Sequence, residues 1–294
     1  MTIQLLDLVQ NNTIHTVDPR ALVLSMLEKH QLQANKGYGQ HFLVAAHVYR
    51  QLLESLDLKP GQQVVEIGPG LGTLTAHLLS YGVFVTAIEK DPNMYSLLQK
   101  ELGGHPRFRL LLMDATTCDF GSLFLGPYSM VGNLPYNVST EILMRALMNT
   151  SSLDKMVFMF QKEVADRIMA KPNSKTYGGL SAKVQLLSTV KRVCLAGPGH
   201  FFPPPKVDSA VLGFVPYKPG RLTAKEFLTY SSLVDCAFMH RRKTLQNALK
   251  GFFDGDRVFL AAGVSPTLRA ENLSVEDYLK LFYAMQGVSL NFLR

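Results

Sequence analysis

The chain has 294 residues, and its 30 Lys and Arg against 23 Asp and Glu give a formal net charge of +7. Hydrophobic residues make up 47% and charged residues 18%, which allows a sizeable core and excludes a chain that is disordered throughout. Residues 218–294 carry 11 basic and 7 acidic side chains, so the basic excess is densest near the C-terminal end. A polyanionic partner such as nucleic acid and a merely soluble basic protein both fit this charge.

Neither cysteine chemistry nor membrane targeting is indicated. Cys118, Cys194 and Cys236 form no CxxC pair, and an odd number of widely spaced cysteines argues against a disulfide framework or a zinc site. We therefore expect no metal. Residues 67–88 and 120–140 lack charged side chains, but Gly, Pro and Asn interrupt both stretches, so neither predicts a membrane-spanning helix. The N-terminus lacks the features of a signal or transit peptide, and we expect a cytoplasmic protein.

Apolar runs of strand length alternate with segments of helical spacing through the first two thirds of the chain. Seven buried strands with intervening helices predict a doubly wound, mostly parallel, Rossmann-like α/β sheet. The last two runs are joined by a loop rich in Gly and Pro, which predicts an antiparallel hairpin at one edge of the sheet. The strand runs are 63–67, 83–88, 108–113, 129–131, 156–160, 190–195 and 210–215, and the clearest helices are 92–102 and 139–148.

The pattern changes after residue 217, where Pro and Gly mark a linker and no further strand-like runs follow. Thr223 with Glu226, and Ser274 with Asp277, are typical helix starts. The sequence therefore predicts a sheet domain over 36–217 and a small all-α domain over 218–294. Residues 1–35 form a predicted N-terminal extension that is helical around 19–30.

A glycine-rich turn, Gly68-Pro-Gly70-Leu-Gly72, connects the first predicted strand to a helix. Glycine lets the backbone approach a ligand closely, and the helix N-terminus offers free N–H groups, so the turn predicts a nucleotide-like cofactor. A plain tight turn or a dinucleotide-dependent dehydrogenase would fit the turn equally well.

Two carboxylates follow at the ends of the next two strands. Glu89 lies 21 residues beyond Gly68, a spacing at which a carboxylate accepts hydrogen bonds from both hydroxyls of a ribose. Asp114 ends the third strand and could accept a hydrogen bond from an adenine amino group. The alternatives are a solvated strand-end residue for Glu89 and a turn or helix-cap aspartate for Asp114.

The fourth strand leads into Asn133-Leu134-Pro135-Tyr136, at the sheet edge where open α/β folds bind substrates. The side-chain oxygen of Asn133 and the carbonyl of Leu134 can accept both N–H bonds of an exocyclic base amine, which frees its lone pair to attack an electrophile. No strong general base is needed, because the amine becomes acidic only after alkylation. Tyr136 offers a ring face for base stacking. An ordinary loop is the alternative, since Asn and Pro favour turns.

Taken together, the motifs resemble those of the ribosomal RNA adenine N6,N6-dimethyltransferases, most closely the small-subunit (16S) type. As a set, in this order, they are very specific, although each is common alone. They are Gly39-Gln-His-Phe-Leu43, Glu66-Ile-Gly-Pro-Gly-Leu-Gly-Thr-Leu-Thr75, Ile88-Glu89, Asp114-Ala115, Asn133-Leu-Pro-Tyr-Asn137, Phe201-Phe-Pro-Pro-Pro-Lys-Val-Asp-Ser209 and Arg241-Arg-Lys-Thr-Leu-Gln-Asn247.

The resemblance implies a methyltransferase sheet that uses S-adenosylmethionine as methyl donor. Phe201 matches the ring that packs on the target adenine opposite Tyr136, although a ring that simply fills the core is the alternative. His41 stands where many relatives carry Asn, so its hydrogen bond to the cofactor is the least certain. The implied cofactor contacts are His41, Leu43, Gly68, Glu89, Asp114 and Asn133, and the implied catalytic set is Asn133, Leu134, Pro135, Tyr136 and Phe201.

Three consecutive cations, Arg241, Arg242 and Lys243, fall within a predicted helix over 238–244. We expect at least one of them to contact phosphate, an interpretation that the family resemblance supports, although a run of charges is more often a solvated face.

The resemblance implies a monomer that acts on small-subunit rRNA or a 30S precursor, methylating two adjacent adenosines of the 3′-terminal hairpin loop, with a role in ribosome biogenesis. Two alternatives remain: a large-subunit (23S) rRNA dimethyltransferase of the macrolide-resistance type, and a non-catalytic nucleic-acid-binding relative.

Overall fold

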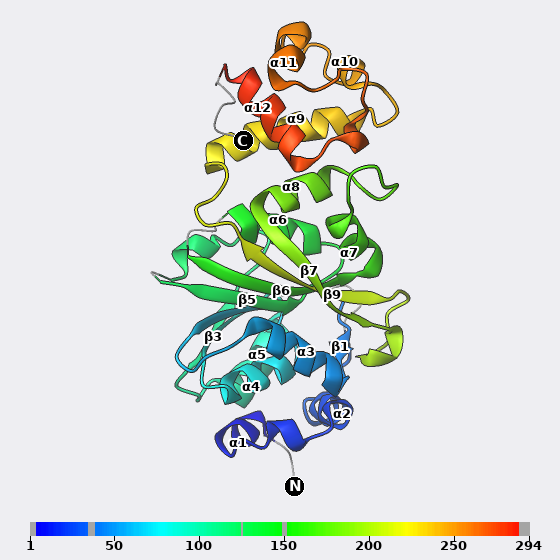
Figure 1. Ribbon diagram of the computed structural model, residues 1–294. Helices are drawn as coiled ribbons and strands as arrows, with labels where there is room; N and C mark the ends of the chain where they lie inside the picture. The colour runs from blue at the N-terminus through cyan, green and yellow to red at the C-terminus, as the bar shows by residue number, and fades with distance from the viewer. Residues whose placement is uncertain (1–3, 35–38, 125, 149–151, 288–294) are drawn as a thin grey trace. The chain divides into compact units, whose positions relative to one another are not determined.

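The chain divides into two compact units in a computed structural model, which describes residues 4–34, 39–124, 126–148 and 152–287. The first unit comprises residues 1–165 and 190–216, and the second comprises 166–189 and 217–294. The first is built around a sheet and the second is mainly helical (Figure 1).

A seven-stranded sheet in the order β4-β3-β2-β5-β6-β9-β7 forms the centre of the first unit (Figure 1). β2 pairs in parallel with β3 and β5, β3 with β4, and β5 with β6, whereas β6 and β9 run antiparallel. The predicted doubly wound, mostly parallel sheet is therefore confirmed, and β9 and β7 are neighbours at one edge. The strands are β2 Gln63–Ile67, β3 Phe84–Glu89, β4 Phe108–Leu112, β5 Tyr128–Asn133, β6 Leu153–Gln161, β7 Ser188–Ala196 and β9 Ser209–Pro216.

Burial explains why the central strands read as nearly continuous apolar runs. Val64 and Val65 of β2, and Met130 and Val131 of β5, are all fully buried although consecutive residues point to opposite faces. Helices therefore cover both faces of the sheet, as parallel strands require. α3 (Ala46–Leu56), α4 (Thr73–Ser80) and α5 (Pro92–Leu102) lie on one face, and α6 (Ser139–Met148) lies on the other (Figure 1).

A second sheet has only two short strands, β1 (Phe42–Leu43) and β8 (Phe201–Phe202), which pair antiparallel. Phe42 lies opposite Phe202, and Leu43 lies opposite Phe201. Sequence analysis missed this sheet because two-residue strands carry no periodicity. It brings residues 41–43 next to 201–203, two segments that are far apart in the chain.

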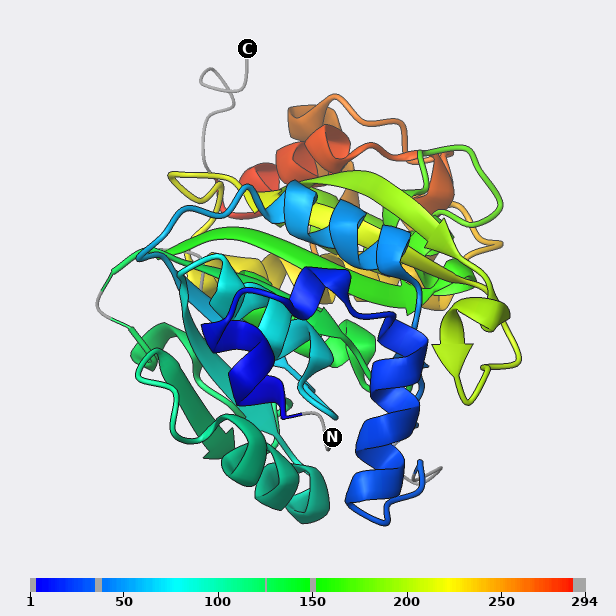
Figure 2. The same cartoon turned by 90° about the horizontal axis from the view of Figure 1, so that it is seen from below.

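The N-terminal extension adds a further layer on α4 and α5. It contains α1 (Leu5–Gln10), a 3-10 turn η1 (Ile14–Thr16) and α2 (Pro19–Lys29), so the helix predicted around 19–30 is present. α1 packs on α4 and α5, while α2 contacts α4 and β1 (Figure 2). Its apolar side chains Leu5, Ile14 and Met26 are fully buried.

Glu101 of α5 anchors both ends of this extension. Its carboxylate accepts hydrogen bonds from the Leu5 N–H at 3.1 Å and from His30 Nε2 at 2.7 Å, and it lies 2.6 Å from Lys29 Nζ. Burial alone would raise the pKa of Glu101, but the hydrogen bonds from Lys29, the Leu5 N–H and His30 outweigh it and hold that pKa below its ordinary value.

The second unit is a set of helices around an aromatic core. Tyr230, Tyr278 and Phe282 are buried, with the Tyr230 ring 6.4 Å from each of the other two. The predicted capping boxes are present, Thr223 with Glu226 at α9 and Ser274 with Asp277 at α12. The helices are α8 Gly179–Leu187, α9 Ala224–Met239, α10 Leu245–Ala248, α11 Gly255–Ala262 and α12 Val275–Met285, and α7 (Lys162–Met169) spans the point where the chain leaves the first unit.

Residues 166–189 pack with the C-terminal helices, although the sequence-based boundary assigns them to the sheet domain. Tyr230 Oη donates to the Ala182 carbonyl at 3.4 Å, and Lys183 Nζ lies 2.8 Å from Asp235 Oδ1. No stretch rich in Pro, Gly or Ser marks where the chain passes into the second unit at 166 or returns at 189, so the sequence pattern does not reveal this segment.

Among the residues described, no helix has both the length and the apolar character that crossing a bilayer requires.

The helix predicted over 238–244 is wrong. α9 ends at Met239, residues 240–243 form a turn closed by the Lys243 N–H on the His240 carbonyl at 2.8 Å, and α10 starts after Thr244. Thr244 has extended backbone angles and bridges to Arg269, so it acts as the N-cap of the next helix. The cation run therefore lies on a turn between two helices.

We expect Glu101→Gln to lower the free energy of unfolding by about 1–3 kcal/mol at neutral pH, because three donors lose a charged acceptor. The pKa of Glu101 is lower in the folded than in the unfolded state, so its stabilisation is present above the unfolded value of 4.5 and is lost as pH falls below it. Urea unfolding should thus show a difference in unfolding free energy between wild type and variant that disappears in acid. The exposed Glu54→Gln on α3 is the control, and a difference independent of pH would contradict the assignment.

Candidate functional site

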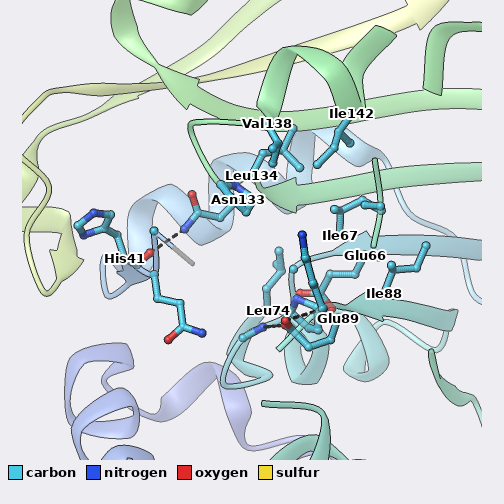
Figure 3. Close-up of a pocket in the computed structure, with 18 of the residues that line it drawn as sticks. His41, Glu66, Ile67, Leu74, Ile88, Glu89, Asn133, Leu134, Val138 and Ile142 are labelled. Carbon is cyan, nitrogen blue, oxygen red and sulfur yellow. Dashed lines mark hydrogen bonds between the residues drawn. The ribbon is translucent and has the colours of Figure 1, made fainter. Parts of the chain in front are cut away.

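A cavity opens at the carboxyl ends of β2, β3, β4 and β5, where the sequence places its candidate residues (Figure 3). The segment 39–43 before and within β1 closes one side. Of the predicted cofactor and catalytic residues, all except Phe201 line this cavity: His41, Leu43, Gly68, Glu89, Asp114, Asn133, Leu134, Pro135 and Tyr136.

The glycine turn after β2 has the backbone conformation that only glycine adopts readily. Gly68 has φ +66° and Gly70 has φ +56°, both in the left-handed region. The Gly70 N–H donates to Glu89 Oε2 at 3.2 Å, which ties the turn to the end of β3. The turn therefore forms one wall of the cavity with main-chain atoms exposed to a ligand.

Glu89 is fixed in place by three main-chain donors. Besides the Gly70 N–H, Oε1 accepts from the N–H groups of Lys90 and Asp91, both at 2.8 Å. Burial raises the pKa of Glu89, while these hydrogen bonds oppose the shift. A carboxylate oriented this way can accept hydrogen bonds from a pair of hydroxyls without reorganisation.

Asp114 is held as an ionised acceptor at the far end of the cavity. Its Oδ2 lies 2.7 Å from Lys90 Nζ, and its Oδ1 accepts from the Thr116 N–H and hydroxyl at 2.9 and 2.7 Å. Lys90, followed by Thr116, lowers the pKa of Asp114 to about 2. Ile88 and Ala115, each next to one of these carboxylates in the chain, add apolar lining to the cavity.

Asn133, at the end of β5, is oriented by the segment before β1. Its amide Nδ2 donates to the His41 carbonyl at 2.8 Å (Figure 3). With the amide nitrogen committed, Oδ1 is the atom left to accept a hydrogen bond from a ligand in the cavity. This geometry matches the acceptor role that the sequence assigns to Asn133.

Tyr136 lies beside His41 at the same end of the cavity. Its hydroxyl is 2.6 Å from Ser209 Oγ, and its ring stacks with the His41 ring at a centroid distance of 6.1 Å and an angle of 22°. Burial raises the pKa of Tyr136, so the phenol stays protonated. His41 Nδ1 bonds the Pro203 carbonyl at 2.8 Å and must be the donor, because a carbonyl only accepts.

Phe201, the predicted stacking partner of Tyr136, is not among the described residues that line the cavity. It is only 1% exposed and belongs to the hydrophobic core around β1. The ring of His41 lies nearly parallel to that of Tyr136. The role of Phe201 in base stacking therefore stays a prediction, and core packing is what its position shows.

Sequence reasoning missed four residues that shape the cavity. Tyr49 donates to the Leu43 carbonyl at 2.9 Å and lies 2.7 Å from Thr73 Oγ1, which fixes the wall formed by β1. Gly132 has no room for a side chain, since a Cβ atom would lie 2.6 Å from the Ile67 carbonyl. A glycine inside a strand pattern was the available signal for this close approach.

The fourth missed residue is Glu66, the first of the glycine-turn motif. It lines the cavity, is 1% exposed and accepts a hydrogen bond from Thr75 Oγ1 at 2.6 Å. Burial raises the pKa of Glu66 to about 8, opposed by Thr75 and reinforced by the charge of Glu89. A charged residue inside the apolar run 63–67 was the available signal, but the strand pattern alone does not show that it faces a ligand cavity.

In the second unit, the structure separates the three predicted RNA-binding cations. Arg241 Nε donates to Glu271 Oε2 at 2.7 Å, and its terminal nitrogen donates to the Lys175 carbonyl. Arg242 and Lys243 have exposed side chains on the turn after α9. Arg241 therefore contacts Glu271 and Lys175 within this unit although its side chain is 42% exposed, and its two neighbours are exposed as well. No group of three or more His, Cys, Asp or Glu among the described residues could hold a metal ion.

The sequence resembles known proteins over most of its length. Residues 31–286 match the family described as ribosomal RNA adenine dimethylase. Ribosomal RNA small subunit methyltransferase A of Pseudomonas savastanoi pv. phaseolicola (strain 1448A / Race 6) is 41% identical over 258 residues, which cover 87% of this chain and 96% of that protein. The protein of the same name from Xanthomonas campestris pv. campestris (strain B100) is 41% identical over 249 residues, covering 84% and 95%.

Two solved structures have the same fold. A dimethyladenosine transferase from Plasmodium falciparum matches with a TM-score of 0.71 at 25% identity, covering 84% of this chain and 99% of that one. The 23S rRNA methyltransferase ErmE matches with a TM-score of 0.64 at 25% identity, covering 83% and 99%. The Rossmann-like methyltransferase fold implied by the motifs is thereby confirmed.

We expect the Glu66 carboxyl to make the first unit less stable as pH rises. Its folded pKa of about 8 exceeds its unfolded value of 4.5, so the unfolding free energy falls between these pH values, by up to about 1.4 kcal/mol per pH unit. Glu66→Gln keeps an acceptor for Thr75 and should flatten this dependence, leaving the variant the more stable protein near pH 8. Urea unfolding from about pH 5 to 9 measures both slopes, and equal slopes would refute the shifted pKa.

Proposed function

The chain belongs to the ribosomal RNA adenine dimethylase family, and on that premise we propose that it methylates N6 of two adjacent adenosines in the 3′-terminal hairpin loop of small-subunit (16S) rRNA. The observation that carries the proposal is the amide of Asn133, held at the cavity with Oδ1 ready to accept. The curated relatives named for the small subunit are 41% identical over 84–87% of this chain, which supports the small subunit as substrate. We place the protein in the cytoplasm, acting as a monomer on rRNA or a 30S precursor during small-subunit biogenesis.

The cavity fits S-adenosylmethionine as the methyl donor. Glu89 would hold the ribose hydroxyls and Asp114 the adenine amino group, while the turn at Gly68 and the backbone of His41 and Leu43 would face the rest of the molecule. The proposal is supported by the two oriented carboxylates, by the apolar residues that also line the cavity, and by the positive-φ turn that lets the main chain approach a ligand. When bound, S-adenosylmethionine supplies an electrophilic methyl group on a positively charged sulfur.

Asn133 and Leu134 present the target amine. The Asn133 Oδ1 and the Leu134 carbonyl accept its two N–H bonds, so the nitrogen lone pair leaves conjugation with the ring and turns toward the methyl group. Pro135 restricts the backbone just after these acceptors. Alignment of this kind can contribute roughly 7–11 kcal/mol over free encounter. The proton leaves only after alkylation, so these residues need no strong base beside them.

Tyr136 supports the target base by stacking, which is worth roughly 1–3 kcal/mol per base. Ser209 fixes the ring through the phenol, and the His41 ring lies on the same side of the cavity. The adenine must leave its stack before it enters, at a cost of a few kcal/mol that is least in a loop. A hairpin-loop target suits this requirement.

We expect Asn133→Ala to bind S-adenosylmethionine within a few-fold of wild type while turnover falls at least about 100-fold, because the acceptor that presents the amine is lost. Calorimetry measures donor affinity. Transfer of labelled methyl groups to under-methylated small subunits and to naked large-subunit RNA, followed by mapping of the modified base, measures turnover and substrate choice.

The exposed Asn93→Ala on α5 is the matched control and should behave as wild type. Near-normal activity of Asn133→Ala would remove the central assignment. Label confined to large-subunit RNA would replace the proposed substrate while leaving the chemistry in place.

We further infer that Arg242 and Lys243 contact RNA phosphate, whereas the Arg241 side chain is already paired with Glu271. Changing Arg242 and Lys243 together to Gln should weaken RNA binding and reduce the slope of log affinity against log salt by about one unit per lost contact. Filter binding across a salt series measures that slope. The charge-matched pair Lys225→Gln and Arg257→Gln, also exposed in the second unit, is the control, and an equal effect there would show a general charge effect instead.

A further inference from the structure

A second concavity lies beside the cavity of the first unit, between α2 and β8. One wall is α2 and the turn after it, with Leu24, Leu27, Glu28 and Gln31, and the other is Phe202 and Pro203. Figure 2 shows α2 in blue next to the short yellow-green strand β8. Its volume of about 640 Å³ lies within the range of ligand pockets, about 300–1,000 Å³. Most of the α2 wall precedes residue 31, where the family match begins.

Strand geometry turns Phe202 toward this groove. Consecutive residues of a strand point to opposite sides, and Phe201 is buried in the core at 1% exposure. Phe202 therefore points the other way, lines the groove and remains partly exposed. A flat aromatic ring in an open groove is a platform on which a nucleobase can stack.

The groove adjoins the end of the cavity where the target base would enter. Pro203 lines the groove, and its carbonyl accepts the hydrogen bond from His41 Nδ1 at 2.8 Å. His41 lines the cavity, and its ring stacks with Tyr136. One hydrogen-bonded pair thus separates the two sites, which suits two nucleotides that are joined through one phosphate.

The lining chemistry selects a base rather than a phosphate. Among the described residues that line the groove, Glu28 is the only charged one, and a carboxylate repels phosphate. The same carboxylate accepts a hydrogen bond from an exocyclic amino group, which adenine has and uracil lacks. Leu24 and Leu27 add apolar surface, and the Gln31 amide can both donate and accept.

We propose that this groove binds the base of the nucleotide next to the target adenosine, stacked on Phe202 with its amino group toward Glu28. The inference rests on the proposed function, under which that neighbour is the second adenosine. The N-terminal extension then takes part in substrate recognition, because α2 supplies one wall of the site.

The test compares under-methylated small subunits that carry adenine at the neighbouring position with subunits that carry uracil there, in single-turnover methylation of the remaining adenosine. Wild type should favour adenine by about 10-fold, because uracil stacks more weakly on Phe202 and has no amino group to donate to Glu28. Phe202→Leu, which keeps an apolar side chain in β8, and Glu28→Ala should each reduce that preference several-fold. Both variants should keep wild-type affinity for S-adenosylmethionine in calorimetry.

Glu54→Ala, the same exposed substitution on α3, is the matched control and should keep the full preference. Variants that retain the wild-type preference for adenine, or a wild type that has none, would overturn the groove assignment while methylation itself persists. Absence of methyl transfer to small-subunit RNA by wild type would instead overturn the proposed function, so the two failures are distinguishable.

Discussion

The hydrogen bond from the Asn133 amide to the His41 carbonyl is the constraint on which the site depends. An asparagine amide can rotate to present either its oxygen or its nitrogen, and only the oxygen accepts the N–H bonds of a base amine. The carbonyl of His41 fixes that choice, because it can only accept. The bond in turn requires β1 to lie beside the end of β5, and Tyr49 holds β1 there through the Leu43 carbonyl. The orientation of the Asn133 amide therefore depends on the packing of β1, although the side chain itself belongs to the central sheet.

The pairing of the short strands β1 and β8 also positions the residues proposed to contact the target base. Because Leu43 and Phe201 are paired in register, the following Pro203 carbonyl comes within reach of His41, and the His41 ring comes to lie beside Tyr136. The N-terminal extension supports this arrangement from outside, since α2 contacts β1 and Glu101 holds α1 and the end of α2 on α5. A segment that precedes the family match thus contacts the strand that orients the Asn133 amide.

Much of the fold could be predicted because the central strands are buried on both faces and therefore read as apolar runs, as in Val64 and Val65 of β2. The cavity residues Glu89, Asp114 and Asn133 could be predicted because parallel strands end at one edge. Interactions between segments far apart in the chain could not be predicted. The strands β1 and β8 are two residues long and so carry no hydrophobic periodicity, and no linker-like sequence sets residues 166–189 apart from the sheet unit. The helix predicted over 238–244 was wrong for a local reason, because His240 leaves the helical conformation directly after Met239 and Thr244 is extended as the N-cap of α10.

Charge explains why a cavity of this kind can tolerate its buried acids. Glu66 and Glu89 both lie beneath the glycine turn, and burial raises the pKa of each, so without a ligand the cavity disfavours two negative charges at once. A cationic ligand reverses that preference, because a positive charge nearby favours the ionised carboxylates. Under the proposed function, the methyl donor would carry such a positive charge and its demethylated product would not. The two buried carboxylates would therefore favour the donor over the product, which would help an enzyme that methylates one nitrogen twice to exchange one for the other.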